Sequence, residues 1–183
     1  MKSLRSAAVF GISILLLAGP AHAQKFVKSG FYSIDATGWQ HKVTASGDNF
    51  RCSTCGVPVQ IQIDYGPILE KDATHKTNRE FLEALNTEDA QKQFAELMLR
   101  KSIPAGGGFR VSIDKVGLAK IGGLDVLEFT ATVANGSVTT LDNSMVAIHK
   151  NRIMKVTLDY FDGTMNDKAG AAISALLKSL IFV

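Results

Sequence analysis

The segment LDVLEFTATV, Leu124–Val133, decides the fold class because it reads as one long β-strand within a run of similar segments. Shorter strand patterns lie on either side of it, at Val111–Ile113, Ser144–Ile148 and Arg152–Tyr160. The connections between these segments are short and contain glycine or asparagine: Ile121-Gly122-Gly123, Asn135-Gly136 and Lys150-Asn151. Connections of this length and composition join antiparallel neighbours. The sequence therefore predicts an antiparallel meander.

Strand patterns also precede the meander. The alternation of apolar and polar residues in Gly30–Asp35 predicts a short strand, and Trp39–Val43 predicts a second one. Ser46–Asn49 has the composition of a hairpin turn. The clearest strand is Val57–Ile63, which places every second residue on one apolar face. We expect this strand to end at Tyr65–Pro67, because glycine and proline interrupt strands.

Two amphipathic segments predict helices that cover the sheet. Thr77 lies three residues before Glu80, which is the capping-box pattern of a helix start. Apolar residues then recur at steps of three and four, and Asn86–Asp89 has the composition of a second cap at which this helix could break. Asn166 precedes the second segment, Ala169–Leu180. We therefore expect an α+β fold with a single antiparallel sheet, a long helix after the first strands and a C-terminal helix packed on the sheet.

The first 23 residues have the organisation of a secretory signal peptide. Lys2 and Arg5 form a basic start, Ala7–Ala18 is apolar, and Ala21-His22-Ala23 is a small-residue cleavage motif. The apolar run is shorter than the roughly 20 residues that span a bilayer, so we expect cleavage and no stable membrane insertion. The sequence then predicts a single domain, residues 24–183, that is periplasmic or secreted.

The charge balance and motif content exclude several function classes. After the signal peptide the chain carries 18 basic and 17 acidic residues without a block of like charge, which gives no basis for nucleic-acid binding. No Gly-x-Ser-x-Gly or His-Glu-x-x-His motif occurs. We interpret the carboxylates Asp125, Glu128, Asp159 and Asp162 as members of ordinary solvated strand faces. We accordingly expect no enzymatic activity and no cofactor, and the sequence identifies no small-molecule ligand.

Both cysteines of the chain lie in one short segment, Arg51-Cys52-Ser53-Thr54-Cys55. In an oxidising compartment Cys52 and Cys55 have only each other as an intramolecular partner, which predicts a local structural disulfide. A redox-active pair needs a stabilised thiolate, usually at a helix N-terminus, whereas here a strand follows the cysteines. Arg51 could still lower the pKa of the Cys52 thiol, and an intermolecular disulfide is a further alternative.

A metal site is another interpretation of the cysteine pair. Structural zinc sites have four ligands, and no second cysteine pair exists in the chain. The other soft donors after the signal peptide are His41, His75 and His149, of which His41 could approach Cys52 and Cys55 across a hairpin. The sequence leaves the disulfide, redox and metal interpretations open.

The order of the predicted elements and four local motifs resemble one family. The motifs are Thr37-Gly38-Trp39, the Ile121-Gly122-Gly123 hairpin before a long strand, Lys150-Asn151-Arg152-Ile153 before the last strand, and the closing segment Ile173–Phe182 with its apolar, strand-like tail. Together they resemble the PsbP/Mog-like family of small α/β proteins, which includes extrinsic photosystem II subunits, a Ran-binding import factor and DcrB-type bacterial envelope proteins. The resemblance implies a non-enzymatic accessory or binding role.

Two hypotheses for the function follow. The first is a secreted or periplasmic accessory protein that contacts another envelope protein or complex through a sheet face or through the segment Arg51–Cys55. The second is a thiol-disulfide or metal-handling protein that uses Cys52 and Cys55, with His41 as a possible third donor.

Overall fold

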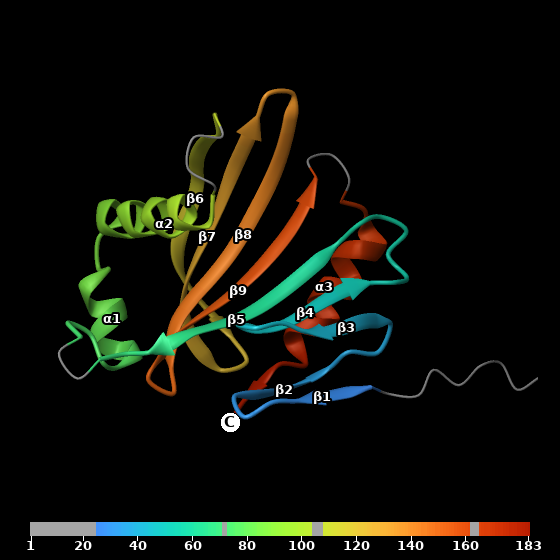
Figure 1. Cartoon of the computed structure of the whole chain (residues 1–183), viewed down its shortest axis with the longest axis horizontal. Coiled ribbons are helices and arrows are strands. Elements are labelled where there is room, and N and C mark those ends of the chain that lie inside the picture. The colour runs from blue at the N-terminus through green and yellow to red at the C-terminus, as the bar shows by residue number, and fades with distance from the viewer. Residues whose placement is uncertain (1–24, 71–72, 104–107, 162–164) are drawn as a thin grey trace, which may run out of the picture.

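The computed structural model describes residues 25–70, 73–103, 108–161 and 165–183, and within them the chain forms ten strands and three helices (Figure 1). The predicted signal peptide lies outside these residues. One sheet has seven strands in the order β3-β4-β5-β9-β8-β7-β6, and a second has three in the order β1-β2-β10. The strands are β1 Phe26–Lys28, β2 Tyr32–Asp35, β3 Trp39–Val43, β4 Gly47–Cys52, β5 Gln60–Ile68, β6 Arg110–Ile121, β7 Leu124–Asn135, β8 Val138–His149, β9 Arg152–Phe161 and β10 Ile181–Phe182.

The predicted meander is confirmed as β6 to β9, which pair consecutively and antiparallel. Its turns are made by residues with positive φ, as two-residue hairpin connections require: Gly122 and Gly123 at 54° and 84°, and Lys150 and Asn151 at 47° and 56°. The strand predicted at Val111–Ile113 is confirmed, but it is longer than predicted, because β6 has 12 residues. A register irregularity between Ile113 and Lys115 interrupts the alternation that marks a strand in the sequence.

The strand predicted at Val57–Ile63 begins only at Gln60, and turn composition misled the prediction at two further places before the first helix. Residues 47–49 do not form a turn; they begin β4, which pairs with both β3 and β5. Gly47 is needed there because a Cβ atom would lie only 1.9 Å from the carbonyl oxygen of Ile63 on β5. The strand β5 also continues through Gly66 and Pro67 to Ile68, with a register irregularity after Tyr65. Sheet pairing therefore overrides the local turn composition at both places.

The expectation of a single sheet was wrong. The predicted strand at 30–35 is β2, but it pairs with β1 and with the C-terminal strand β10 instead of joining β3. The register places Val27 opposite Ile34 and Ile181 opposite Ser33. Segments from the two ends of the domain thus form one small sheet. A local sequence pattern does not predict pairing between residues so far apart in the chain.

The helix after the first strands is broken, as the second cap indicated. The helix α1, Asn78–Ala84, begins at the Thr77 capping box, and α2, Glu88–Ser102, begins at Thr87, whose hydroxyl accepts a hydrogen bond from the amide of Ala90. The C-terminal helix α3, Asp167–Lys178, begins at Asn166 as predicted. No helix of the described residues is long and apolar enough to cross a membrane.

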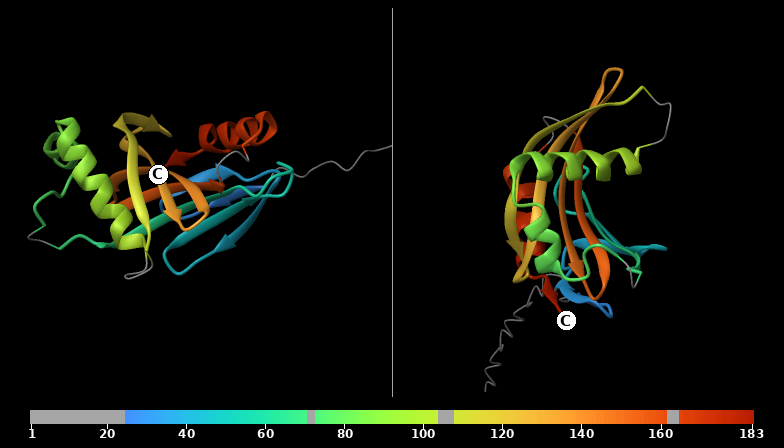
Figure 2. Two further views of the ribbon diagram at one scale, coloured as in Figure 1. Left: turned by 90° about the horizontal axis from the view of Figure 1, so that it is seen from above. Right: turned by 90° about the vertical axis from the view of Figure 1, so that its left-hand side faces the viewer.

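Two apolar clusters lie on opposite faces of the large sheet. The first contains residues of α3, the small sheet and one face of the large sheet, and the second contains residues of α1, α2 and the other face. Neighbouring residues of β7 show the alternation, since Val126 belongs to the first cluster and Leu127 to the second. Figure 2 shows α2 and α3 at opposite sides of the sheet. The helices α1 and α2 contact β6, β7 and β8, so they cover only this part of their face.

Candidate functional site

The cysteine segment forms a tight loop between β4 and β5. Cys52 is the last residue of β4, and its sulfur lies at disulfide distance from that of Cys55, with 5.7 Å between the two Cα atoms. Both cysteines are buried, whereas Arg51, Ser53 and Thr54 are exposed. The structure agrees with the predicted local pairing. Because thiol-disulfide exchange requires access to a sulfur atom, this burial disfavours exchange on the folded domain.

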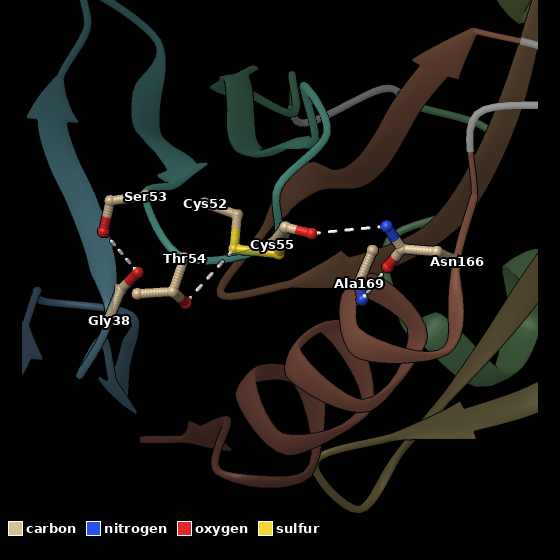
Figure 3. The surroundings of a disulfide bond; sticks show 7 residues. All are labelled: Gly38, Cys52, Ser53, Thr54, Cys55, Asn166 and Ala169. Atoms are coloured by element: carbon tan, nitrogen blue, oxygen red, sulfur yellow. Dashed lines mark hydrogen bonds between the residues drawn. A yellow bond between two sulfur atoms is a disulfide. The ribbon is translucent and has the colours of Figure 1, made fainter.

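We call residues 51–56 the disulfide loop, and hydrogen bonds tie it to two other elements (Figure 3). The amide and hydroxyl of Ser53 both donate to the carbonyl oxygen of Gly38, at 3.2 and 2.7 Å. On the other side, the Asn166 amide group donates to the carbonyl oxygen of Cys55 at 3.4 Å, while the same side chain caps α3. The loop is therefore held between the start of β3 and the start of α3, and the hydroxyl of Thr54 lies 3.8 Å from the sulfur of Cys52.

His41 lies in a different environment from the cysteines. Its register partner is Phe50, on which the imidazole stacks at a centroid distance of 5.0 Å, whereas Trp39 lies opposite Cys52. The Nε2 atom of His41 is 2.6 Å from Oδ1 of Asp48. Within residues 25–70, 73–103, 108–161 and 165–183, no group of three or more His, Cys, Asp or Glu side chains is arranged to hold a metal ion.

Asp48 connects the two sheets. Its second carboxylate oxygen accepts a hydrogen bond from the hydroxyl of Tyr32 on β2 at 2.5 Å, so the buried carboxylate is bonded to both β2 and β3. Burial, followed by the hydrogen bond to Asp48, raises the pKa of Tyr32 far above its ordinary value. In this network Tyr32 and His41 both bond to the Asp48 carboxylate, so we interpret it as a structural contact between the two sheets.

A hollow of about 400 Å³ opens beside the disulfide loop. It is lined by Arg51 and Pro58, which lie in or next to the loop, and by Val59, Gln60, Thr140, Asp159 and Tyr160. A second hollow of about 420 Å³ shares Thr140 and Asp159 with the first. The C-terminal end of α2 lines the second hollow, together with Gln62, Asp64, Val133, Asp142, Lys155 and Thr157. We call the two hollows together the polar groove, after the charged and polar residues that line the second hollow; the lining of the first hollow is mostly apolar.

Two carboxylates meet within the polar groove. Asp142 on β8 and Asp159 on β9 are direct register partners, and Ser144 donates a hydrogen bond to Asp142 at 2.6 Å. Desolvation by the surrounding protein atoms raises the pKa of Asp159, and repulsion from Asp142 adds to this effect. The resulting pKa is about 6, although the residue remains exposed to solvent.

The sequence interpretation of Asp159 as a solvated residue missed this pair. A signal for it exists, because the two-residue turn at Lys150-Asn151 fixes the register of β8 and β9 and thereby sets Asp142 opposite Asp159. Of the other predicted site residues, Arg51 lines the first hollow together with Asp159. The cysteines are in the disulfide loop, and His41 contacts Asp48.

Comparisons with known proteins give the fold. No protein-family model matches the chain, and no curated protein matches it significantly. The chain is similar to the solution structure of the cyanobacterial PsbP protein, CyanoP, from Synechocystis sp. PCC 6803, with a TM-score of 0.58 and 13% identity over 97% of this chain and 98% of that one.

Two other solved structures are similar at a lower level. One is a Bacteroides thetaiotaomicron protein, with a TM-score of 0.49 and 12% identity over 88% of this chain and 49% of that one. The other is LpqN, involved in cell envelope biogenesis of Mycobacterium tuberculosis, with a TM-score of 0.49 and 12% identity over 87% and 90%. The likeness to CyanoP spans nearly the whole of both chains and agrees with the motifs seen in the sequence. The chain therefore has the PsbP-like fold.

Proposed function

We propose that this protein is a non-enzymatic accessory protein of the bacterial envelope, which binds another envelope protein through the disulfide loop and the adjacent mouth of the polar groove. The observation that carries the proposal is the combination of an exposed, internally fixed loop with a hollow of about 400 Å³ beside it. A fold can host many functions, so the argument rests on this site and not on the fold alone.

The rigidity of the disulfide loop favours binding. Arg51, Ser53 and Thr54 are exposed, while the disulfide and the contacts to Gly38 and Asn166 hold the backbone beneath them. A loop that is already ordered loses little conformational entropy when a partner binds. Arginine is also enriched at protein interfaces, because its guanidinium forms several directed hydrogen bonds.

The compartment follows from the predicted signal peptide. Residues 1–23 would direct the chain across the inner membrane, where an oxidising environment permits a disulfide between Cys52 and Cys55. We propose the periplasm as the site of action, which restricts the partners to envelope proteins.

Site-specific photo-cross-linking in the native host tests this function. A photoreactive phenylalanine derivative at position 54 should give a discrete adduct with one envelope protein, identified by mass spectrometry. The matched control is the same derivative at Glu83 on α1, which is exposed and lies at the other end of β5 (Figure 1). An adduct from position 54 and none from position 83 supports the proposal; equal adducts from both positions, or none from either, would overturn it.

A thiol-disulfide or metal-handling role for Cys52 and Cys55 is the alternative, and the same strain separates the two. If the pair is a staple, a Cys52→Ser/Cys55→Ser variant should keep its partner adduct at reduced yield. If the pair is the reactive group, the phenotype of this variant should equal that of a deletion.

A further inference from the structure

We propose that the polar groove receives a lysine or arginine side chain from an extended segment of the partner, held between Asp142 and Asp159. The inference rests on the binding function proposed above and names the chemistry of the partner at that site. Its occupant is a basic peptide segment, and not a free metal ion or a lipid.

The groove has the size and openness of a binding surface. Its two hollows of about 400 and 420 Å³ each lie in the range of about 300–1,000 Å³ that ligand pockets occupy. Thr140 and Asp159 line both of them, so the two hollows are neighbours between the disulfide loop and the end of α2. A segment bound at the loop can therefore continue along the sheet face.

The charges that line the groove favour a cation. Three carboxylates, those of Asp64, Asp142 and Asp159, line it together with two basic side chains, Lys155 and Arg51. Lys155 is the register partner of Asp64, whereas Asp142 and Asp159 face each other. Like charges directly opposite on neighbouring strands are destabilising, and a cation between them removes that repulsion.

Asp159 has spare capacity to accept hydrogen bonds. Ser46 and Gln62 donate to Asp64, and Ser144 donates to Asp142. The carboxylate of Asp159, in contrast, has no hydrogen bond or ion pair with another side chain among the described residues, although the backbone of Asp159 pairs with β5 and β8. An ammonium or guanidinium group supplies several donors at once, which matches this pair of carboxylates.

The end of α2 contributes backbone groups and charges beside the groove. This 15-residue helix ends at Ser102, and Leu99, Ser102 and the following residue Ile103 line the groove. The last carbonyl groups of a helix carry the negative end of its dipole, which attracts cations within about one turn. Arg100 and Lys101 lie in the same last turn and oppose this potential, so the charge argument rests on the carboxylate pair.

The groove should bind basic segments less well in acid. Asp159 faces Asp142 on β8 and Lys155 on its own strand, and Arg51 and Asp64 are the other charged residues that line the groove. Because the pKa of Asp159 is about 6, acidification from pH 7.5 to pH 5 removes one of the two charges that face the bound cation.

Peptide titrations followed by NMR test the inference. The probes are a short blocked peptide that alternates lysine and threonine and a matched peptide that alternates glutamate and threonine. The lysine peptide should shift the amide signals of Gln62, Thr140 and Asp159. Its Kd should rise about tenfold or more in the Asp142→Asn/Asp159→Asn variant, because both carboxylates that face the cation are neutral there.

Controls separate a specific site from general attraction. Asp125→Asn removes a single charge, as each single variant at position 142 or 159 does, from the exposed ion pair with Lys120 in the β6–β7 hairpin and should change the Kd less than twofold. An unchanged Kd in the Asp142→Asn/Asp159→Asn variant would overturn the proposal, as would an equal loss in Asp125→Asn or equal binding of the glutamate peptide. Single variants at positions 142 and 159, each checked for its thermal transition, guard against a fold defect.

Cross-linking from position 54 distinguishes a failure of this inference from a failure of the proposed function. One outcome is that the partner adduct forms in the natural sequence and persists at full yield in the Asp142→Asn/Asp159→Asn variant. The partner then binds without the carboxylate pair, and only the inference about the groove is refuted. If the natural sequence gives no adduct, the binding function itself falls.

Discussion

Asp159→Asn should stabilise the domain at neutral pH, and the gain should vanish in acid. The pKa of Asp159 is raised from 3.8 to about 6, so the folded state binds a proton at this carboxyl more tightly than the unfolded state does. The stability that this protonation contributes is fully present below about pH 3.8 and is lost as the pH rises through about 6. Asparagine cannot ionise, and it therefore removes the penalty that the charged form carries.

The size of the gain follows from the shift after a correction for solvent. A shift of about two pKa units corresponds to at most about 3 kcal/mol at about 1.36 kcal/mol per unit. Because Asp159 is exposed to solvent, water offsets much of this penalty, which comes from desolvation and from repulsion by Asp142. We expect a gain of about 0.5–1 kcal/mol in the free energy of unfolding at pH 7.5.

Urea denaturation at pH 7.5 and pH 4 measures the difference. Asp159→Asn should unfold at a higher urea midpoint than the natural sequence at pH 7.5 and at about the same midpoint at pH 4. Asp125→Asn, which removes an exposed charge from an ion pair with Lys120, is the control and should show no such gain at pH 7.5. A gain of equal size at both pH values would refute the reasoning, because no proton linkage would then be involved.

Three further substitutions test the scaffold by urea denaturation. Cys52→Ser/Cys55→Ser should lower the free energy of unfolding by only about 1–2 kcal/mol, since the disulfide closes a very small loop; a loss above about 4 kcal/mol would contradict this. Gly47→Ala should lower the free energy of unfolding by about 3 kcal/mol or more, because its Cβ atom would lie 1.9 Å from a carbonyl oxygen of β5. Gly117→Ala is the control and should leave the free energy of unfolding nearly unchanged, because the space around Gly117 is open. Tyr32→Phe should cost about 1–3 kcal/mol, because a buried carboxylate loses one of its two donors; no loss would show that the hydrogen bond is dispensable.

Local patterns predicted those elements whose cause is local. The meander follows from turn residues such as Lys150-Asn151, and the break between α1 and α2 follows from the cap at Thr87. The strand β4 escaped prediction because residues 47–49 have turn composition, and only the flanking strands β3 and β5 make them extended. The small sheet escaped prediction because β2 and β10 lie at opposite ends of the domain.

The candidate site was predictable in part. The Cys-x-x-Cys spacing indicated the local disulfide, which agrees with the structure. The register of β8 and β9 also implies the pair Asp142–Asp159, but its effect on the pKa depends on the protein atoms around the carboxyl group. The second hollow of the groove depends on where the end of α2 lies over the sheet, and the periodicity of the helix sequence does not determine that position.

The central claim is that the disulfide loop binds an envelope partner, and the affinity of the partner identified by cross-linking tests it most directly. The Kd of the purified pair is measured for the natural sequence, for Arg51→Ala/Thr54→Ala in the loop, and for Arg79→Ala/Glu83→Ala, which removes an exposed ion pair of α1. We predict a rise in Kd of about tenfold or more for the loop variant and of less than twofold for the α1 variant. An unchanged Kd for the loop variant, or an equal rise for both, would contradict the account.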